Sequence, residues 1–174
     1  SDYQKGLLTP RVVAHVVGAP LELCDSSTEE GRAVLEHASP IWQVPVLDTG
    51  DTGVVLDSHA IIDYLVERFG AGALVRPAAG DRLHEQNRIH VVDGALDAAI
   101  NVLYLRREGV LPDAAPYLKK QMDRVASAMS WLEKDLAARP NPDRGAAFGL
   151  FEIALVTTLD WMRFRDMYPV ERHP

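Results

Sequence analysis

The stretch QVPVLDTGDTGVVLDSHAIIDYL, residues 43–65, decides the fold of this chain. Two β-branched runs, Val44–Leu47 and Val54–Leu56, flank a Gly-rich turn and therefore predict a β-hairpin. An Asp-Ser pair follows the second run, and apolar residues then recur at helical spacing up to Phe69. We therefore expect a helix directly after the hairpin, with Ser58 as its N-cap and Gly70 as its end.

The hairpin turn contains two adjacent Asp-Thr-Gly copies, a triplet that suggests an aspartic protease. Protease chemistry needs two carboxylates in contact, each on its own loop, that share one proton. Asp48 and Asp51 instead lie in one short turn, where water solvates both. We interpret the repeat as a hairpin loop, because Gly supplies positive φ and Asp caps its own turn.

Two other features of the same stretch suit a small ligand. The Val44–Pro45 bond could be cis, which would leave the peptide groups of Val44 free to pair with a ligand backbone. The alternative is a trans proline that starts an edge strand. Asp57 and Ser58 precede a helix whose free N–H groups attract a carboxylate, while Asp57 can accept from an ammonium. The pair suits an amino-acid head group, although a plain N-cap explains Ser58 equally well.

The rest of the chain changes character near residue 75. Before that point, a short helix is predicted at Pro10–Val17, with Thr9 as its N-cap. A short strand is predicted at Leu21–Cys24, and a polar helix at Thr28–His37. Residues 70–80 are rich in Gly, Ala and Pro and are predicted to be a linker. After them only helices are predicted, at residues 83–108, 117–138 and 150–165. The last helix has Gly149 as a possible cap and Glu152 three residues further on. The predicted fold class is α/β plus all-α, with domains at residues 1–72 and 80–174.

Composition excludes several classes of protein. The 174 residues include 25 acidic and 18 basic side chains, a formal net charge of -7, which argues against nucleic acid or an anionic membrane as the main partner. The one cysteine, Cys24, ends an apolar run, so we expect a buried thiol, no intramolecular disulfide and a cytoplasmic protein. His84 and His90 have the wrong spacing for one helical face, and we expect no metal.

Four segments in the same order resemble the glutathione S-transferase superfamily. They are GAPLEL from Gly18, PIWQVPVLDTG from Pro40, VVLDSHAIIDYLVERFG from Val54 and FGLFEIALVTTLDWMRFR from Phe148. The resemblance implies a thioredoxin-like N-terminal domain followed by an all-helical C-terminal domain, with glutathione as co-substrate.

The resemblance also implies the roles of individual residues at a glutathione site. By position, Val44 beside Pro45 pairs its main chain with the cysteinyl part of glutathione. Asp57 and Ser58 hold the γ-glutamyl end, and Gln43 donates to the glycyl carboxylate.

The thiolate-stabilising hydroxyl of this family lies in a turn before the first helix. Counted back from Pro20, Ser1 and Tyr3 are the candidate catalytic residues. The segment SDYQKG has no strand pattern, although the family has a first strand inside its sheet. We expect segments of the family pattern to be missing there, near residues 139–149 and after residue 174.

The function expected from the resemblance is glutathione transfer to an electrophilic small molecule by a homodimer, with the helices Leu83–Glu108 and from Tyr117 at the interface. A non-catalytic interaction or regulatory protein is one alternative, and a glutathione-dependent isomerase or dehalogenase is another. Asn101, Tyr104 and Arg106 are expected either at the second-substrate pocket or on a solvated surface.

Overall fold

The computed structural model describes residues 5–111, 115–139 and 148–173, with side chains from residue 8 onward. The chain divides into two compact units. The first comprises Ser1–Arg76 together with Ala147–Ile153, and the second comprises Pro77–Ala146 together with Ala154–Pro174. The short segment 147–153 therefore belongs with the N-terminal part of the chain, although about seventy residues separate the two along the sequence. Each unit is described by itself.

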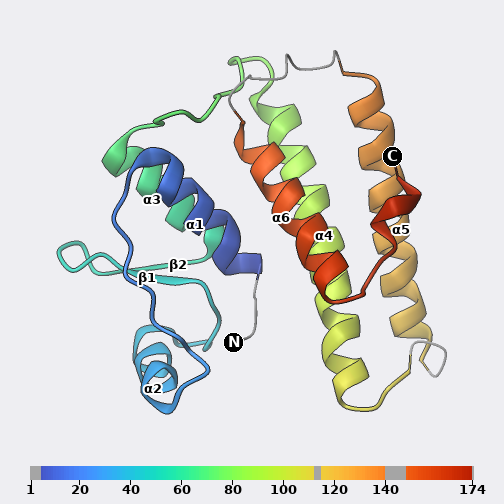
Figure 1. Cartoon of the computed structure of the whole chain (residues 1–174), viewed down its shortest axis with the longest axis horizontal. Helices are drawn as coiled ribbons and strands as arrows, with labels where there is room; N and C mark the ends of the chain where they lie inside the picture. Colours follow the sequence, from blue (N-terminus) through green and yellow to red (C-terminus); the bar gives the residue numbers. More distant parts are fainter. Residues whose placement is uncertain (1–4, 112–114, 140–147, 174) are drawn as a thin grey trace. The chain divides into compact units, whose positions relative to one another are not determined.

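The described part of the first unit consists of a hairpin, three helices and the start of α6 (Figure 1). The helices are α1 (Lys5–Val17), α2 (Glu29–Ala38) and α3 (Ser58–Phe69), and the strands are β1 (Val46–Asp48) and β2 (Val54–Leu56). The strands pair antiparallel with Val46 opposite Leu56 and Asp48 opposite Val54, so the predicted hairpin is confirmed. A core of buried side chains joins α1 to α3, and it consists of Val13, Ala14, Ile61, Ile62, Leu65, Leu74 and Ile153.

The prediction of a strand at Leu21–Cys24 is wrong. In the part of the chain that the structure describes, the sheet contains only β1 and β2, so this segment has no strand to pair with. A strand needs a neighbour for its N–H and C=O groups, and without one the segment remains an irregular loop in water. Leu23 is 53% exposed, and Cys24 is exposed and not buried as expected.

The first helix also differs from its prediction, because α1 begins at Lys5 and not at Pro10. Thr9 therefore lies inside the helix and is not its N-cap, and Pro10 is tolerated although it lacks the N–H that helix interiors use. The second helix agrees with its prediction. The side chain of its N-cap, Thr28, accepts a hydrogen bond from the backbone N–H of Gly31 at 3.0 Å.

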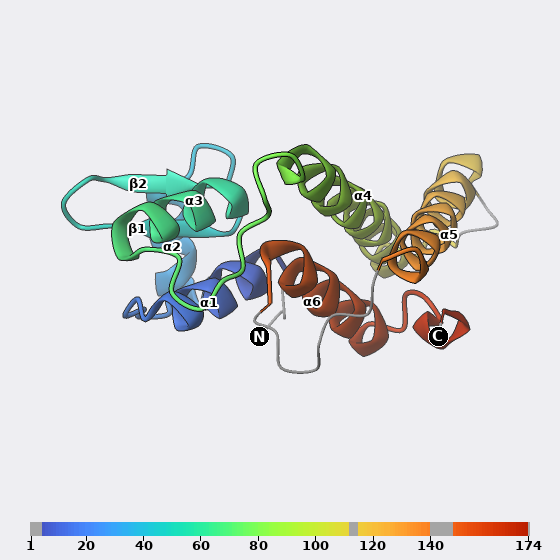
Figure 2. The ribbon, with the colours of Figure 1, turned by 90° about the horizontal axis from the view of Figure 1, so that it is seen from above.

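The second unit is helical where it is described (Figures 1 and 2). Its elements are α4 (Arg82–Arg107), α5 (Pro116–Ala137), most of α6 (Leu150–Phe164) and the 3-10 turn η2 (Val170–Arg172). The long helices α4 and α5 bury apolar side chains such as Val92 and Val125. A half-buried ion pair of 2.7 Å between Arg88 Nε and Asp135 Oδ2 links the same two helices.

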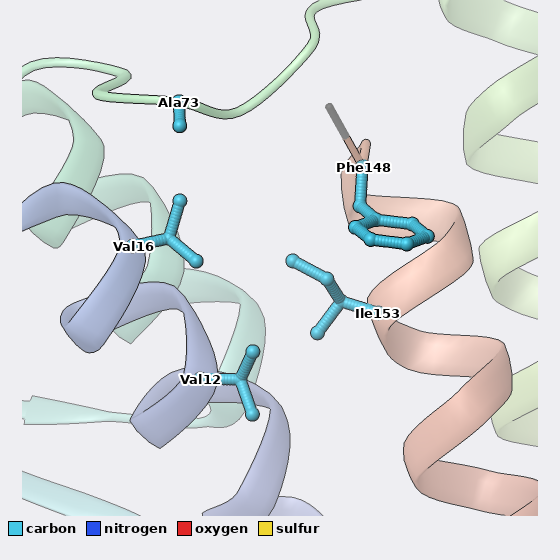
Figure 3. Close-up of a pocket in the computed structure, with 5 residues that line it drawn as sticks. All are labelled: Val12, Val16, Ala73, Phe148 and Ile153. Carbon is cyan, nitrogen blue, oxygen red and sulfur yellow. The ribbon is translucent and has the colours of Figure 1, made fainter. Parts of the chain in front are cut away.

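The start of α6 has the cap that the sequence predicted. The Glu152 carboxylate accepts a hydrogen bond from the backbone N–H of Gly149 at 3.0 Å, which satisfies one of the free donors at the helix start. Phe148 and Ile153 stand on either side of this cap, at the two positions of a hydrophobic staple. Figure 3 shows the Phe148 ring next to the Ile153 side chain, which points toward α1.

Candidate functional site

The loop between α2 and β1 presents free backbone groups. Its Val44–Pro45 peptide bond is cis, which is the first of the two alternatives given above. Pro45 is buried, Val44 is half-buried and Gln43 is exposed. Within the described residues, no backbone hydrogen bond involves Val44, so its N–H and C=O remain available to a ligand. The turn is held instead by the N–H of Trp42, which donates to the carbonyl of Ser39 at 3.2 Å.

Asp57 begins α3 in an unusual backbone conformation. Its φ of 76° and ψ of 143° lie in a region that is almost restricted to glycine, and occupying it costs an L-residue on the order of 1–3 kcal/mol. The Asp57 carboxylate accepts a hydrogen bond from the backbone N–H of His59 at 2.8 Å. One carboxylate oxygen thus caps the helix, and the exposed side chain keeps further lone pairs for another donor.

The assignment of Ser58 as the N-cap is therefore wrong, because Asp57 has that role and Ser58 is the first helical residue. The physical reason is that the cap must have a non-helical φ and ψ, and the chain leaves the helix at Asp57. The half-buried Ser58 hydroxyl has no partner among the residues that the structure describes. This hydroxyl can therefore donate to a ligand without breaking an internal bond.

The hairpin brings these two segments to the same place. Val46 and Leu56 are paired across the strands, and Pro45 and Asp57 each lie one residue beyond that pair. The free main chain of Val44 and the start of α3 consequently lie at one end of the hairpin. An acidic group, an alcohol, helix N–H groups and free peptide groups together suit a zwitterionic ligand with a peptide backbone.

The structure does not test the other site residues of the sequence analysis. Ser1 and Tyr3 are outside the described residues. Asn101 and Arg106 belong to the second unit, where the Asn101 amide donates to the carbonyl of Asp97 at 2.7 Å. Their proposed place at a second-substrate pocket stays a prediction.

Sequence reasoning missed one feature of the candidate site. Trp42, next to Gln43, has a φ of 55° and is 68% exposed, and positive φ is rare for a bulky side chain. No dipeptide signal for positive φ, such as Asn-Gly, marks this position. A signal was nevertheless present, because Ile41 and Trp42 are two large apolar residues in a loop next to a candidate ligand segment.

A small apolar cavity of about 170 Å³ also lies in the first unit (Figure 3). Its lining residues are Val12, Val16, Ala73, Phe148 and Ile153. None of them belongs to the candidate site, and none has a polar side chain. A zwitterionic ligand cannot replace its lost water contacts there, so this cavity is not the site for such a ligand.

The described residues contain neither a metal-binding cluster nor a membrane-spanning helix. Across residues 5–111, 115–139 and 148–173, no three His, Cys, Asp or Glu side chains are grouped so that they could bind a metal ion. No helix in the same ranges combines the length and the apolar character that crossing a membrane requires.

Comparison with known proteins identifies the N-terminal part. Residues 9–73 match the family model described as glutathione S-transferase, N-terminal domain. This segment is therefore a glutathione S-transferase N-terminal domain, and the superfamily predicted from the motifs is confirmed. No curated protein matches the chain.

Solved structures show that the likeness extends over the whole fold. A glutathione S-transferase from Methylobacterium radiotolerans, in complex with glutathione sulfonate, superposes with a TM-score of 0.78 at 24% identity over 98% of this chain and 81% of that one. For one from Methylobacillus flagellatus with glutathione bound, the TM-score is 0.76 at 21% identity, with 98% and 88% covered. A maleyl pyruvate isomerase, a bacterial zeta-class glutathione S-transferase, gives 0.74 at 23% identity, with 98% and 85% covered. The predicted fold class, a thioredoxin-like domain followed by a helical one, is thus confirmed.

Proposed function

We propose that this protein binds reduced glutathione and transfers its thiolate to an electrophilic small molecule. The observation that most supports the proposal is the pairing of Val46 with Leu56, which puts the free main chain of Val44 beside the start of α3. Two structural neighbours with glutathione or glutathione sulfonate bound support the choice of ligand.

Each part of glutathione has a chemical partner at this site. Asp57 accepts hydrogen bonds from the α-ammonium of the γ-glutamyl residue. The Ser58 hydroxyl and the first N–H groups of α3 donate to its α-carboxylate, which the positive end of the helix dipole also favours. Val44 pairs its peptide groups with the cysteinyl residue, and Gln43 donates to the glycyl carboxylate.

The transfer step needs one further group, a hydroxyl near the sulfur. A hydroxyl that donates to the thiolate stabilises the charged form and lowers the thiol pKa from its ordinary value of about 8.5. Ser1 or Tyr3 has this role in our proposal. The thiolate then attacks the electrophilic carbon and displaces the leaving group or adds to a double bond.

A glutathione-dependent isomerase is the second candidate function. It is favoured by the maleyl pyruvate isomerase among the structural neighbours. The same thiolate would add to a double bond reversibly and leave after rotation, so glutathione would not be consumed. Turnover of chlorodinitrobenzene with loss of free thiol indicates the transferase, whereas isomerisation at constant thiol concentration indicates the isomerase.

Glutathione binding can be tested by isothermal titration of the parent protein and three variants. Asp57→Asn and Ser58→Ala remove proposed contacts, while Asp63→Asn makes the same charge change at an exposed position further along α3. A hydrogen bond to a charged group contributes roughly 1.5–3 kcal/mol, so Asp57→Asn should raise the Kd at least about tenfold. Asp63→Asn should leave the Kd unchanged. If Asp57→Asn bound glutathione as tightly as the parent, the proposed site would be wrong.

We also propose a cytoplasmic homodimer with domains at residues 1–72 and 80–174, on the basis of the family fold. Helices α4 and α5 provide much of the interface in this proposal. Light scattering at micromolar concentration should give twice the mass of one chain, and the mass of a single chain would contradict the dimer.

A further inference from the structure

Three side chains of the second unit form a continuous hydrogen-bond chain that the proposed glutathione chemistry does not use. The Tyr168 hydroxyl lies 2.8 Å from His173 Nε2, and His173 Nδ1 lies 2.8 Å from Glu133 Oε2. Glu133 is on α5, whereas Tyr168 and His173 lie just before and just after η2. Two stretches of the chain, helix α5 and the segment around η2, therefore meet at one imidazole ring.

When the His173 ring is neutral, only one arrangement of protons satisfies both of its hydrogen bonds. An ionised carboxylate only accepts hydrogen bonds, so Nδ1 of His173 must donate to Glu133. In a neutral imidazole the other nitrogen is then an acceptor, and the Tyr168 hydroxyl donates to Nε2. The phenolic proton of Tyr168 thus points directly at a base, and a carboxylate holds that base in the required tautomer.

We propose that Tyr168 is an activated nucleophile that takes up an acyl group from activated aryl esters, with His173 as its proton acceptor and Glu133 as the positioning residue. A hydroxyl, an imidazole and a carboxylate joined in this order have the roles found in acyl-transfer triads, which are recognised by geometry and not by sequence position. Here the hydroxyl belongs to a tyrosine.

The acyl transfer needs no reactant besides the ester. The Tyr168 oxygen attacks the ester carbonyl carbon while its proton moves to Nε2 of His173. A bond forms between that oxygen and the acyl carbon, and the bond from the acyl carbon to the aryl oxygen breaks. The aryl oxide leaves and takes up a proton, which restores neutral His173. The Glu133 carboxylate stabilises the imidazolium that exists in between.

The surroundings permit this chemistry. The side chains of His173 and Glu133 are 18% and 37% exposed, and Tyr168 is half-buried, so all three side chains are partly accessible to solvent. Glu171 is the acidic residue nearest to His173 in the sequence. Its carboxylate accepts a hydrogen bond from Arg163 Nε at 3.1 Å. Glu171 is therefore engaged elsewhere and does not replace Glu133 as the partner of the ring.

The proposal can be tested within a single sample of the parent protein. Brief treatment with p-nitrophenyl acetate, followed by peptide mass spectrometry, measures the acetylation of each tyrosine separately. Tyr104 and Tyr117 are internal controls, since they are 50% and 52% exposed and no imidazole contacts their hydroxyls in the described residues. Exposure alone predicts that these two react first. The proposal predicts that Tyr168 reacts first, and equal or slower labelling of Tyr168 would overturn it.

Two variants then separate activation from mere accessibility. His173→Gln removes the proton acceptor and should lower the rate of Tyr168 acetylation at least about tenfold, since general bases contribute up to roughly 10²–10⁴ in rate. Glu133→Gln keeps an oxygen that can accept from Nδ1 but removes the charge, so the rate should also fall. A purely structural tie would leave the Glu133→Gln rate unchanged, and that result would contradict the role of Glu133. An unchanged circular dichroism spectrum and Tm in both variants shows that the fold is intact.

Discussion

The backbone of Asp57 allows a sharp test of the structure, because its conformation and its cap have opposite effects on stability. At φ 76° and ψ 143°, a residue with a Cβ costs on the order of 1–3 kcal/mol relative to its preferred conformations. Glycine avoids this cost. The Asp57 carboxylate meanwhile caps α3 through its hydrogen bond to the His59 N–H at 2.8 Å.

Asp57→Ala and Asp57→Gly should therefore differ in the free energy of unfolding. Alanine keeps the strained conformation and loses the cap, so Asp57→Ala should lose about 1 kcal/mol. As a cap, glycine lowers the free energy of unfolding by only a few tenths of a kcal/mol relative to aspartate. Its freer unfolded chain lowers it by about 0.4–1 kcal/mol more, but glycine also removes the strain. The glycine variant should thus be more stable than the alanine variant by roughly 1–3 kcal/mol.

Thermal unfolding followed by circular dichroism can measure this difference. For a chain of this size, 1 kcal/mol shifts Tm by about 2–4 °C, so Asp57→Gly should melt at least about 2 °C above Asp57→Ala. Both variants lack the carboxylate, so both should bind glutathione more weakly than the parent protein. If the two variants melted at the same temperature, Asp57 would not have the strained conformation that the structure shows.

Three further substitutions, two of them with a matched control variant, test the same unit by Tm. Gly72→Ala should cost more than about 1 kcal/mol, because Gly72 has a φ of 55° and an added Cβ would lie 2.6 Å from the carbonyl oxygen of Val16. Gly53→Ala is its control, since that position has a positive φ but no atom within 4 Å of the added Cβ. Glu152→Ala should lose about 1 kcal/mol with the cap of α6, whereas Glu152→Gln should lose less because glutamine can make the same bond. Ser58→Ala should change Tm little, because Ser58 is not the N-cap of α3, and a loss of several degrees would contradict that assignment.

The neighbourhood of Pro45 and Asp57 was predictable from the sequence, because it depends on residues close along the chain. Pro45 and Asp57 flank the paired strands of one hairpin, so the predicted hairpin was enough to place them together. The same holds for Glu152, whose bond to Gly149 joins residues three apart. The N-cap of α3 was assigned to Ser58 and not to Asp57. Both side chains can cap a helix, and only the backbone conformation decides which residue does so.

The long helices α4, α5 and α6 were also predicted from the sequence, because apolar residues recur at a spacing of three and four whatever the helix packs against. The irregular segment at residues 21–24 required the tertiary structure. Its apolar pattern suits a strand, yet a strand exists only where a second strand accepts its hydrogen bonds, and the described residues provide none. The exposure of Cys24 and the hydrogen bond between Glu133 and His173 depend in the same way on segments that are distant in the sequence. Periodicity and caps act over one or two turns and can be read from sequence, whereas strand pairing and long-range hydrogen bonds depend on which distant segments the fold brings together.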